Sequence, residues 1–213
     1  MANGVYTLVS ASSGKCVDVA GGSTVTVTTY ADLVEYATAS APYIIRVNGA
    51  VTATPSGNEI KVASNKTIIG VGAGGQVVSG GFHLGVGAHN VITENLTIRD
   101  TRVASDGPDD KEFDYDGIQT DPAHHIWTDR NTIVRMDDGL IDGRQDTGYP
   151  TVSWNVIAEP KQTGSTCVGC SGQQETGGSA FTPSSFHPYR LDPAANVPNP
   201  VRTYAGPQAS IGL

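Results

Sequence analysis

The chain has 213 residues, among them 26 glycines and 12 prolines, and 38% of its residues are hydrophobic. This composition suits one turn-rich domain with a core, and it excludes a disordered chain or a protein of long helices. The formal net charge of −8 comes from 13 basic and 21 acidic residues, without a basic patch for a phosphate backbone, so we expect no nucleic-acid partner. We expect no membrane partner either, because no apolar run approaches the length that spans a bilayer.

The chain begins with the polar segment MANGVYTL, which lacks the charged and apolar regions of a secretory signal. We expect residues 1–21 to form a disordered leader without a function of its own. The first element that the spacing predicts is a helix over residues 29–39, where Leu33, Tyr36 and Ala37 fall on one face.

Short strand-like runs, separated by Gly, Asn and Asp turns, follow from about residue 43. The clearest runs are 43–47, 59–64, 66–71, 90–98, 125–133 and 151–157. The last three superimpose and place Asn95, Asn131 and Asn155 at equivalent positions, with Val71 one unit earlier, at spacings of 24, 36 and 24 residues. A unit of this length made of short strands is typical of a solenoid, and the regular leucines of leucine-rich repeats are absent. We therefore predict an all-β, right-handed, single-stranded parallel β-helix, truncated, with one short N-terminal helix.

Twelve of the 21 acidic residues fall between residues 106 and 146. Asp138 and Asp142 lie four apart on an extended segment, so their side chains share one face, and coil stacking places Asp116 beside them. Three converging carboxylates form a hard-oxygen site, and we predict that it binds Ca²⁺. A solvated acidic loop is the alternative, but interleaved apolar residues oppose it in the second half of this stretch. An EF-hand is excluded, because Ala123 stands where its loop needs Glu and no helix flanks the loop.

Cys167 and Cys170 form a lone CxxC pair, and Cys16 is the third cysteine. Zinc would need four ligands, which no second pair or nearby histidine cluster supplies. We expect either a local disulfide or two thiols without a role.

Four segments closely resemble secreted bacterial pectate lyases of the parallel β-helix family, of actinobacterial type. They are ASNKTIIGVG (63–72), GGFHLGVGAHNVITENLTIRDT (80–101), DGIQTDPAHHIWTDRNTI (116–133) and DDGLIDGRQDTGYPTVSWN (137–155). The C-terminal segment 178–213 is similar to the tail of those enzymes. YTLVSASSGKCVDVAG (6–21) resembles the opening of a ricin-type carbohydrate-binding β-trefoil repeat. The resemblance divides the chain into the leader 1–21 and the β-helix 22–213, in which residues 158–177 replace missing coils.

The resemblance implies Ca²⁺-dependent β-elimination of pectate, also called polygalacturonate, by a secreted enzyme that we expect to be a monomer. In the family, calcium held by aspartates bridges the enzyme to the substrate's carboxylates, and the matching positions here are Asp116, Asp138 and Asp142. Arg144 and Lys111 stand near these aspartates, and Lys161 falls near the family's lysine, so we expect all three to bind substrate. Pairing with neighbouring acids is the alternative for Arg144 and Lys111.

The sequence departs from the family pattern at the catalytic base. In the family the base is an arginine on a later coil, and no arginine here matches it, so the catalytic residue is unknown. Arg130 also stands where the family usually has histidine. Two alternatives to an active lyase therefore stay open: an impaired remnant that binds calcium or pectate without turnover, and a polygalacturonase-type hydrolase. The sequence gives the hydrolase no support, because Gly-His-Gly and Asn-Thr-Asp, the motifs typical of polygalacturonases, are absent.

Overall fold

The computed structural model describes residues 21–105, 113–159 and 193–213. Lys111, Lys161, the three cysteines and residues 1–20 lie outside the described residues, so the predictions made for them stay predictions. The elements are β1 (Ser23–Val27), α1 (Tyr30–Thr38), β2 (Tyr43–Val47), β3 (Ala50–Thr52), β4 (Asn58–Lys61), β5 (Lys66–Gly70), the short 3-10 turn η1 (Gly72–Gly74), β6 (Gln76–Val78), β7 (Gly80–Leu84), β8 (His89–Glu94), β9 (Thr97–Arg99), β10 (Ile118–Thr120), β11 (His124–Asp129), β12 (Thr132–Val134), β13 (Ile141–Gly143), β14 (Gly148–Ser153), β15 (Val156–Ala158), the 3-10 turn η3 (Ala194–Asn196) and α2 (Pro198–Tyr204).

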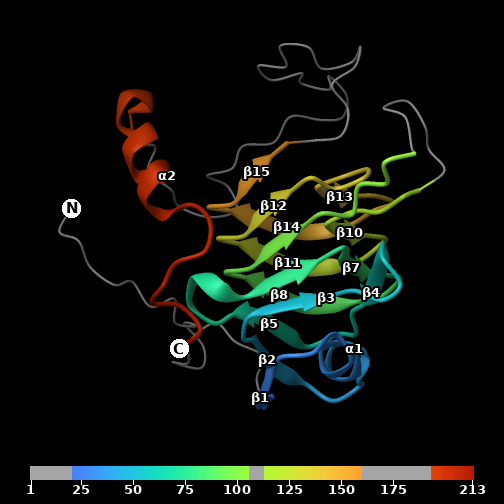
Figure 1. The fold of residues 1–213 in the computed structure, drawn as a ribbon. Helices are drawn as coiled ribbons and strands as arrows, with labels where there is room; N and C mark the ends of the chain where they lie inside the picture. Colours follow the sequence, from blue (N-terminus) through green and yellow to red (C-terminus); the bar gives the residue numbers. More distant parts are fainter. Residues whose placement is uncertain (1–20, 106–112, 160–192) are drawn as a thin grey trace.

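The strands stack into three parallel sheets, which form the walls of a solenoid (Figure 1). One sheet has the order β1-β2-β5-β8-β11-β14, the second β4-β7-β10-β13, and the third β3-β6-β9-β12-β15. Every pairing is parallel, and each strand pairs with the equivalent strand of the next coil. The predicted parallel β-helix is confirmed.

Apolar side chains fill the solenoid interior in columns, one residue from each coil. In the third sheet the column contains Val51, Val77, Ile98 and Ile133, all of which are buried. Full burial of a side chain of this kind stabilises a protein by about 1.5–3 kcal/mol. Because a two-residue period alternates faces along a strand, the same register turns the residues on either side of each column member toward the outer face.

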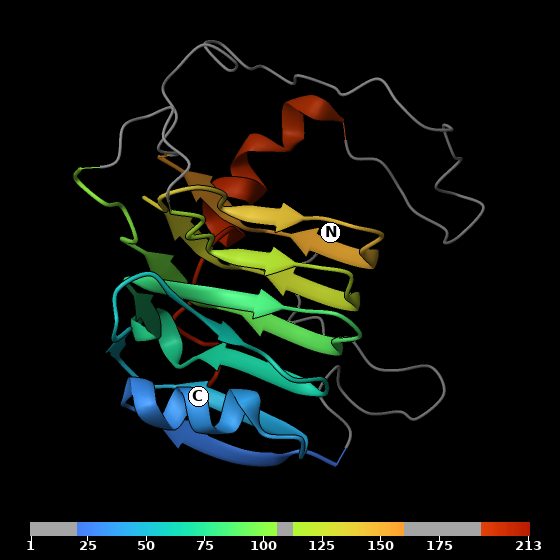
Figure 2. The ribbon, with the colours of Figure 1, turned by 90° about the vertical axis from the view of Figure 1, so that its right-hand side faces the viewer.

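Helix α1 covers the first coil, as Figure 2 shows at the end of the stack where β1 lies. The Thr29 side chain caps the helix by accepting a hydrogen bond from the backbone N–H of Asp32 at 3.2 Å. Leu33 and Ala37 are fully buried against the coil. The helix predicted over residues 29–39 is confirmed.

The predicted runs 90–98, 125–133 and 151–157 each contain two strands rather than one. The break in each run is two residues long, and the first of them lies in the left-handed region: Asn95 (φ 59°), Arg130 (φ 51°) or Trp154 (φ 54°). This residue turns the chain from the six-stranded sheet into the five-stranded one. The repeated asparagine lies at this corner in the first run, as Asn95, and one residue after it in the other two, as Asn131 and Asn155.

The predicted equivalence of Asn95 with Asn131 is wrong by one residue. Asn131 stacks on Leu96, whose backbone N–H donates to Asn131 Oδ1 at 3.0 Å across 35 residues. On the other side, the backbone N–H of Asn131 donates to Asn155 Oδ1 at 2.8 Å across 24 residues, as the sequence predicted. The left-handed geometry required at the corner, rather than the residue type, sets the register.

The C-terminal tail runs along the outside of the stack. The backbone N–H of Gly206 bonds to Trp154 O in the last described coil, and Gln208 bonds to Asn95. Further on, Ile211 O accepts from Gly72 N at 2.8 Å, and Gly212 O accepts from Arg46 Nε at 2.9 Å. The tail therefore connects the last described coil to one of the first.

The last described coil turns apolar side chains to solvent. Val152, Trp154 and Ile157 occupy positions whose counterparts in earlier coils are covered by the next coil. Among the helices that the structure describes, none combines the length and apolar character needed to cross a bilayer.

Candidate functional site

The candidate site lies on the outer face of the four-stranded sheet. Register places His83 of β7, Gln119 of β10 and Asp142 of β13 side by side on this face. Their neighbours Phe82 and Ile118 point inward and are fully buried. Packing of Phe82 and Ile118 in the core thus fixes the strands. The fixed strands in turn hold the row His83, Gln119 and Asp142 in position on the outer face.

Four aspartates gather at the start of β10 and β13, and we call Asp114, Asp116, Asp138 and Asp142 the acidic cluster. One carboxylate oxygen from each of Asp114, Asp116 and Asp138 lies within 4.8 Å of the other two. Asp116 is fully buried, whereas Asp114 and Asp138 are exposed. The three therefore form a cup that opens to solvent.

Burial and mutual repulsion disfavour the charged forms of Asp116 and Asp138. The pKa of Asp116 is raised to about 6, mainly by burial and also by the charges of Asp114 and Asp138, against a hydrogen bond from Gly139 N that lowers it. The pKa of Asp138 is also raised, mainly by burial and then by its contact with Asp114. Such carboxylates gain stability from any cation placed among them.

Glu59 of β4 supports the cluster from two coils earlier, because β4 pairs with β7 and β7 pairs with β10. Its Oε1 accepts a hydrogen bond from the backbone N–H of Asp116 at 2.7 Å. Burial raises the pKa of Glu59 to about 7, and the negative charges of Asp116 and Asp114 add to that effect. Glu59 thus holds the backbone of the buried aspartate and adds negative potential beneath it.

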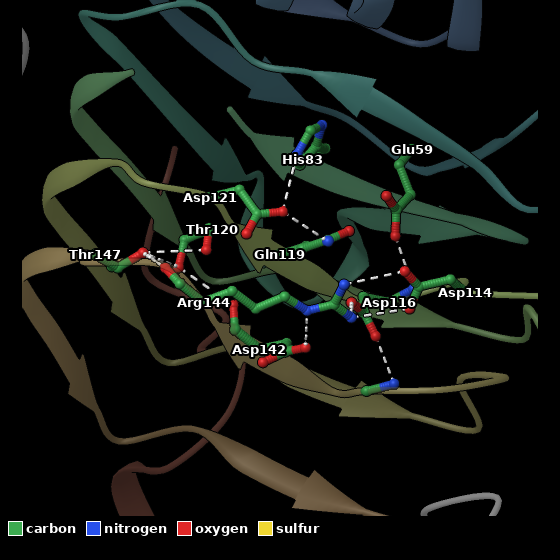
Figure 3. Close-up of polar contacts among 11 residues, drawn as sticks. Glu59, His83, Asp114, Asp116, Gln119, Thr120, Asp121, Asp142, Arg144 and Thr147 are labelled. Atoms are coloured by element: carbon green, nitrogen blue, oxygen red, sulfur yellow. Dashed lines mark hydrogen bonds and ion pairs between the residues drawn. The ribbon is translucent and has the colours of Figure 1, made fainter. Parts of the chain in front are cut away.

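Arg144 reaches over the cluster from the end of β13, as Figure 3 shows. Its Nη2 and Nη1 lie 2.9 Å and 3.1 Å from the two carboxylate oxygens of Asp114, and its Nε lies 2.5 Å from Asp142 Oδ2. A longer contact of 3.5 Å joins Nη2 to Asp116 Oδ2. These carboxylates raise the pKa of Arg144, and the guanidinium holds the pKa of Asp114 below its usual range.

Two glycines give the buried aspartate its space. A Cβ on Gly81 would stand 2.0 Å from the backbone oxygen of Asp116, and a Cβ on Gly139 would stand 2.5 Å from Asp116 Oδ1. Gly139 also donates its backbone N–H to that same Oδ1. Larger residues at either position would displace Asp116.

A second polar group lies one strand away on the same face. Gln119 Nε2 donates to Asp121 Oδ2 at 2.9 Å, and His83 Nε2 lies 3.6 Å from the same oxygen. Asp121 Oδ1 and His83 Nε2 are buried without a hydrogen-bond partner among the described residues.

The structure brings two of the three predicted ligands, Asp116 and Asp138, into the group of converging oxygens. The third, Asp142, does not belong to that group and contacts Arg144 Nε instead. Asp114 was not predicted, although it completes the group of three converging oxygens. Its signal was present, since Asp114 and Asp116 lie two apart on an extended segment and therefore share a face. Lys111 and Lys161 lie outside the described residues.

Comparison with known proteins finds relatives described as pectate lyases or pectate trisaccharide-lyases. A family model described as pectate lyase matches residues 9–183. A pectate trisaccharide-lyase from Thermotoga sp. (strain RQ2) is 35% identical over 171 residues, which cover 79% of this chain and 45% of the relative. One with the same name from Bacillus licheniformis is 35% identical over 150 residues, 64% of this chain and 41% of the relative. The chain thus spans about half the length of the curated relatives it matches.

Solved structures show the same architecture. A pectate lyase from Bacillus sp. N165, in complex with trigalacturonate, matches with a TM-score of 0.50 and 27% identity over 67% of this chain and 49% of that chain. A pectate lyase from Paenibacillus sp. 0602 matches with a TM-score of 0.54 at 17% identity, over 71% of this chain and 42% of that chain, and shares the fold. The family model and these relatives agree: the chain belongs to the pectate lyase family.

Proposed function

We propose that the chain binds polygalacturonate through a calcium ion held by the acidic cluster and catalyses calcium-dependent β-elimination of that polymer. The observation that carries this proposal is the convergence of Asp114, Asp116 and Asp138 on one oxygen cup, in a chain of the pectate lyase family. The solved relative in complex with trigalacturonate supports the class of substrate.

The donor set fits calcium. Calcium takes oxygen ligands at about 2.3–2.6 Å, so oxygens within 4.8 Å of one another can all reach one ion. The donors are carboxylates without nitrogen or sulfur, which suits a hard cation rather than zinc or copper. Exposure of Asp114 and Asp138 leaves the outer side of the cup open to a carboxylate of the polymer.

Some residues of the site would bind the charges of the ion and the polymer, and others hold those residues in position. When bound, calcium neutralises the uronate carboxylate and makes the proton on the adjacent carbon easier to remove. The acidic cluster holds that charge in place, and Glu59 and Gly139 keep Asp116 in the geometry the site requires. Arg144 presents a planar fork that matches a carboxylate. We propose Lys111 and Lys161 as further contacts with the polymer, and we assign the proton-accepting base to no described residue.

The polymer substrate is found outside cells, so we also propose that the protein is secreted. Recovery of the protein from the culture medium of its native host is the expected result. Recovery from the cells alone would contradict it.

Ultraviolet absorbance of the unsaturated uronate ends tests the proposed reaction directly. Polygalacturonate is incubated with the folded protein in calcium, and a parallel sample contains an excess of chelator. We expect absorbance to rise with calcium and to stay flat with chelator. A flat trace in both samples, from protein shown to be folded by circular dichroism, would contradict turnover. Calorimetry with oligogalacturonate and calcium would then show whether binding alone survives.

A further inference from the structure

Arg144 and a bound cation would need the same oxygens. Asp114 and Asp116 belong to the three-oxygen cup, and both already contact the Arg144 guanidinium. We propose that Arg144 is the internal counter-ion of the acidic cluster, that a divalent cation displaces it, and that the displaced guanidinium then binds a uronate carboxylate. This inference rests on the proposed function and adds an order of binding to it: cation first, polymer second.

The guanidinium contacts the cluster through three of its nitrogens. Nη1 and Nη2 form a fork with both oxygens of Asp114 at 3.1 Å and 2.9 Å, and Nε contacts Asp142 at 2.5 Å. In this arrangement one positive charge neutralises part of the repulsion among four carboxylates. Arg144 therefore occupies the place of a cation in the protein as it stands (Figure 3).

The two cations cannot share the cup. A divalent ion bound to Asp114 and Asp116 would stand within a few ångströms of the guanidinium, where two positive charges repel strongly. The oxygens of Asp114 that accept from Arg144 would also have to turn toward the ion. Binding of the ion thus requires the fork with Asp114 to open.

The side chain has a route away from the cluster. One third of the Arg144 side chain is exposed, and Asp114 is more than half exposed, so the fork opens toward solvent rather than into the core. Asp142 stands on β13, two residues before Arg144, and can keep its contact with Nε while the rest of the guanidinium turns outward. On that outer face the fork would meet a polymer carboxylate bridged to the ion.

Calorimetric titration with calcium alone, without polymer, tests the displacement. Arg144→Gln removes the competing charge, so we expect it to bind calcium more tightly than the parent, on the order of tenfold. Arg144→Lys keeps a charge but loses the fork, and we expect an affinity between the two. Arg135→Gln is the matched control, because Arg135 is similarly exposed and paired with Asp100 and Glu159 outside the cluster. Its calcium affinity should equal that of the parent.

A second titration, with trigalacturonate at saturating calcium, tests the role of the displaced side chain. We expect Arg144→Gln to bind the trisaccharide more weakly than the parent and Arg135→Gln to bind it equally well. Equal or weaker calcium binding by Arg144→Gln overturns the displacement, and if lyase activity persists in the parent, the proposed function stands without it. Calcium binding by neither protein, together with absent activity, overturns the proposed function itself.

Discussion

Asp138 and Asp116 stand on neighbouring coils and face the same cup, but water reaches only Asp138. The exposed carboxylate of Asp138 can bind a cation directly from solvent, without leaving a buried site. The buried one must be held in place by the protein whether or not a cation is present. The two residues therefore call for different experiments.

We predict that Asp138→Ala weakens calcium binding. The substitution removes one of the three converging oxygens and leaves the other two without a third ligand. Titration calorimetry of the variant and the parent measures the change, which we expect to be on the order of tenfold to a hundredfold. Asp146→Ala, an acidic residue outside the cluster, is the control. Equal affinities in Asp138→Ala and the parent would contradict the assignment.

Asp116 makes the cation-free protein less stable as the pH rises. Its pKa is raised from 3.8 to about 6 in the folded protein, so the folded state holds this proton more tightly than the unfolded state. The resulting stability is fully present below pH 3.8 and is lost as the pH rises through 6. At neutral pH the loss amounts to about 3 kcal/mol.

We therefore predict that Asp116→Asn stabilises the protein in chelator at neutral pH. Asn keeps an oxygen for the Gly139 N–H but carries no charge. Denaturant unfolding at several pH values between 4 and 8 should give a smaller fall in stability with pH for the variant than for the parent. Parallel curves for the two proteins would show that the carboxyl of Asp116 does not titrate in this range. The variant should also lose calcium affinity.

Part of the site was predictable from residues alone. Asp138 and Asp142 on one extended segment indicated convergence, because a spacing of four residues keeps one face of a strand. Asp114 was not predicted, and the pairing of Arg144 with neighbouring acids was predicted only as the alternative to substrate binding. A one-dimensional charge pattern does not say whether an arginine beside several acids turns toward them or toward solvent.

At the scale of elements, the corner between the six-stranded and the five-stranded sheet depends on buried amides. Asn131 is fully buried, and its Nδ2 donates to Thr93 O at 2.9 Å while its Oδ1 accepts from Leu96 N. Asn155 repeats the pattern one coil later by donating to Thr128 O. These bonds satisfy backbone groups that the corner removes from the sheets.

We predict that Asn131→Ala lowers the free energy of unfolding by about 2–4 kcal/mol, because it leaves buried backbone groups unpaired. Urea denaturation of the variant and the parent measures the difference. Asn131→Leu is a useful second variant, because Leu96 occupies the equivalent position one coil earlier. We expect it to restore volume but not the lost bonds, so it should remain less stable than the parent. A Leu variant as stable as the parent would mean that packing alone holds this corner.

The sequence predicted these elements unevenly. The run 43–47 and the helix 29–39 were recovered within a residue, because each is bounded by clear turn or cap residues. The repeated asparagines identified the corner at Asn95, but Asn131 and Asn155 lie one residue after the corners at Arg130 and Trp154. Three different residue types adopt the same left-handed conformation there, so the requirement comes from stacking on neighbouring coils and not from local propensity.

At the scale of the whole molecule, a solenoid is a row of units that each contact only their neighbours. Stability in such a row is close to a sum of local terms, and either end can open first. The C-terminal tail changes this, because it bonds to Trp154, Asn95, Gly72 and Arg46 along the stack. The tail therefore couples the unfolding of coils that would otherwise open independently.

We predict that ending the chain after Ala205 destabilises it by about 2–5 kcal/mol, the sum of several lost hydrogen bonds. The urea transition should also broaden, because the coils are free to open separately. Arg46→Gln, which removes one of these bonds, is the control and should lower the free energy of unfolding far less. A shortened chain with the midpoint and slope of the parent would show that the tail rests on the stack without stabilising it.

The bond between Arg46 and Gly212 joins residues 166 positions apart. Closing a loop of that length costs roughly 4–5 kcal/mol of chain entropy, which is recovered only when the tail has docked. A ribosome releases Arg46 long before it has made Gly212, so the early coils must wait for another 166 residues before this partner exists. The described coils can begin to fold from β1 and β2, but the bond that fastens the tail to them can form only after Gly212 has been made.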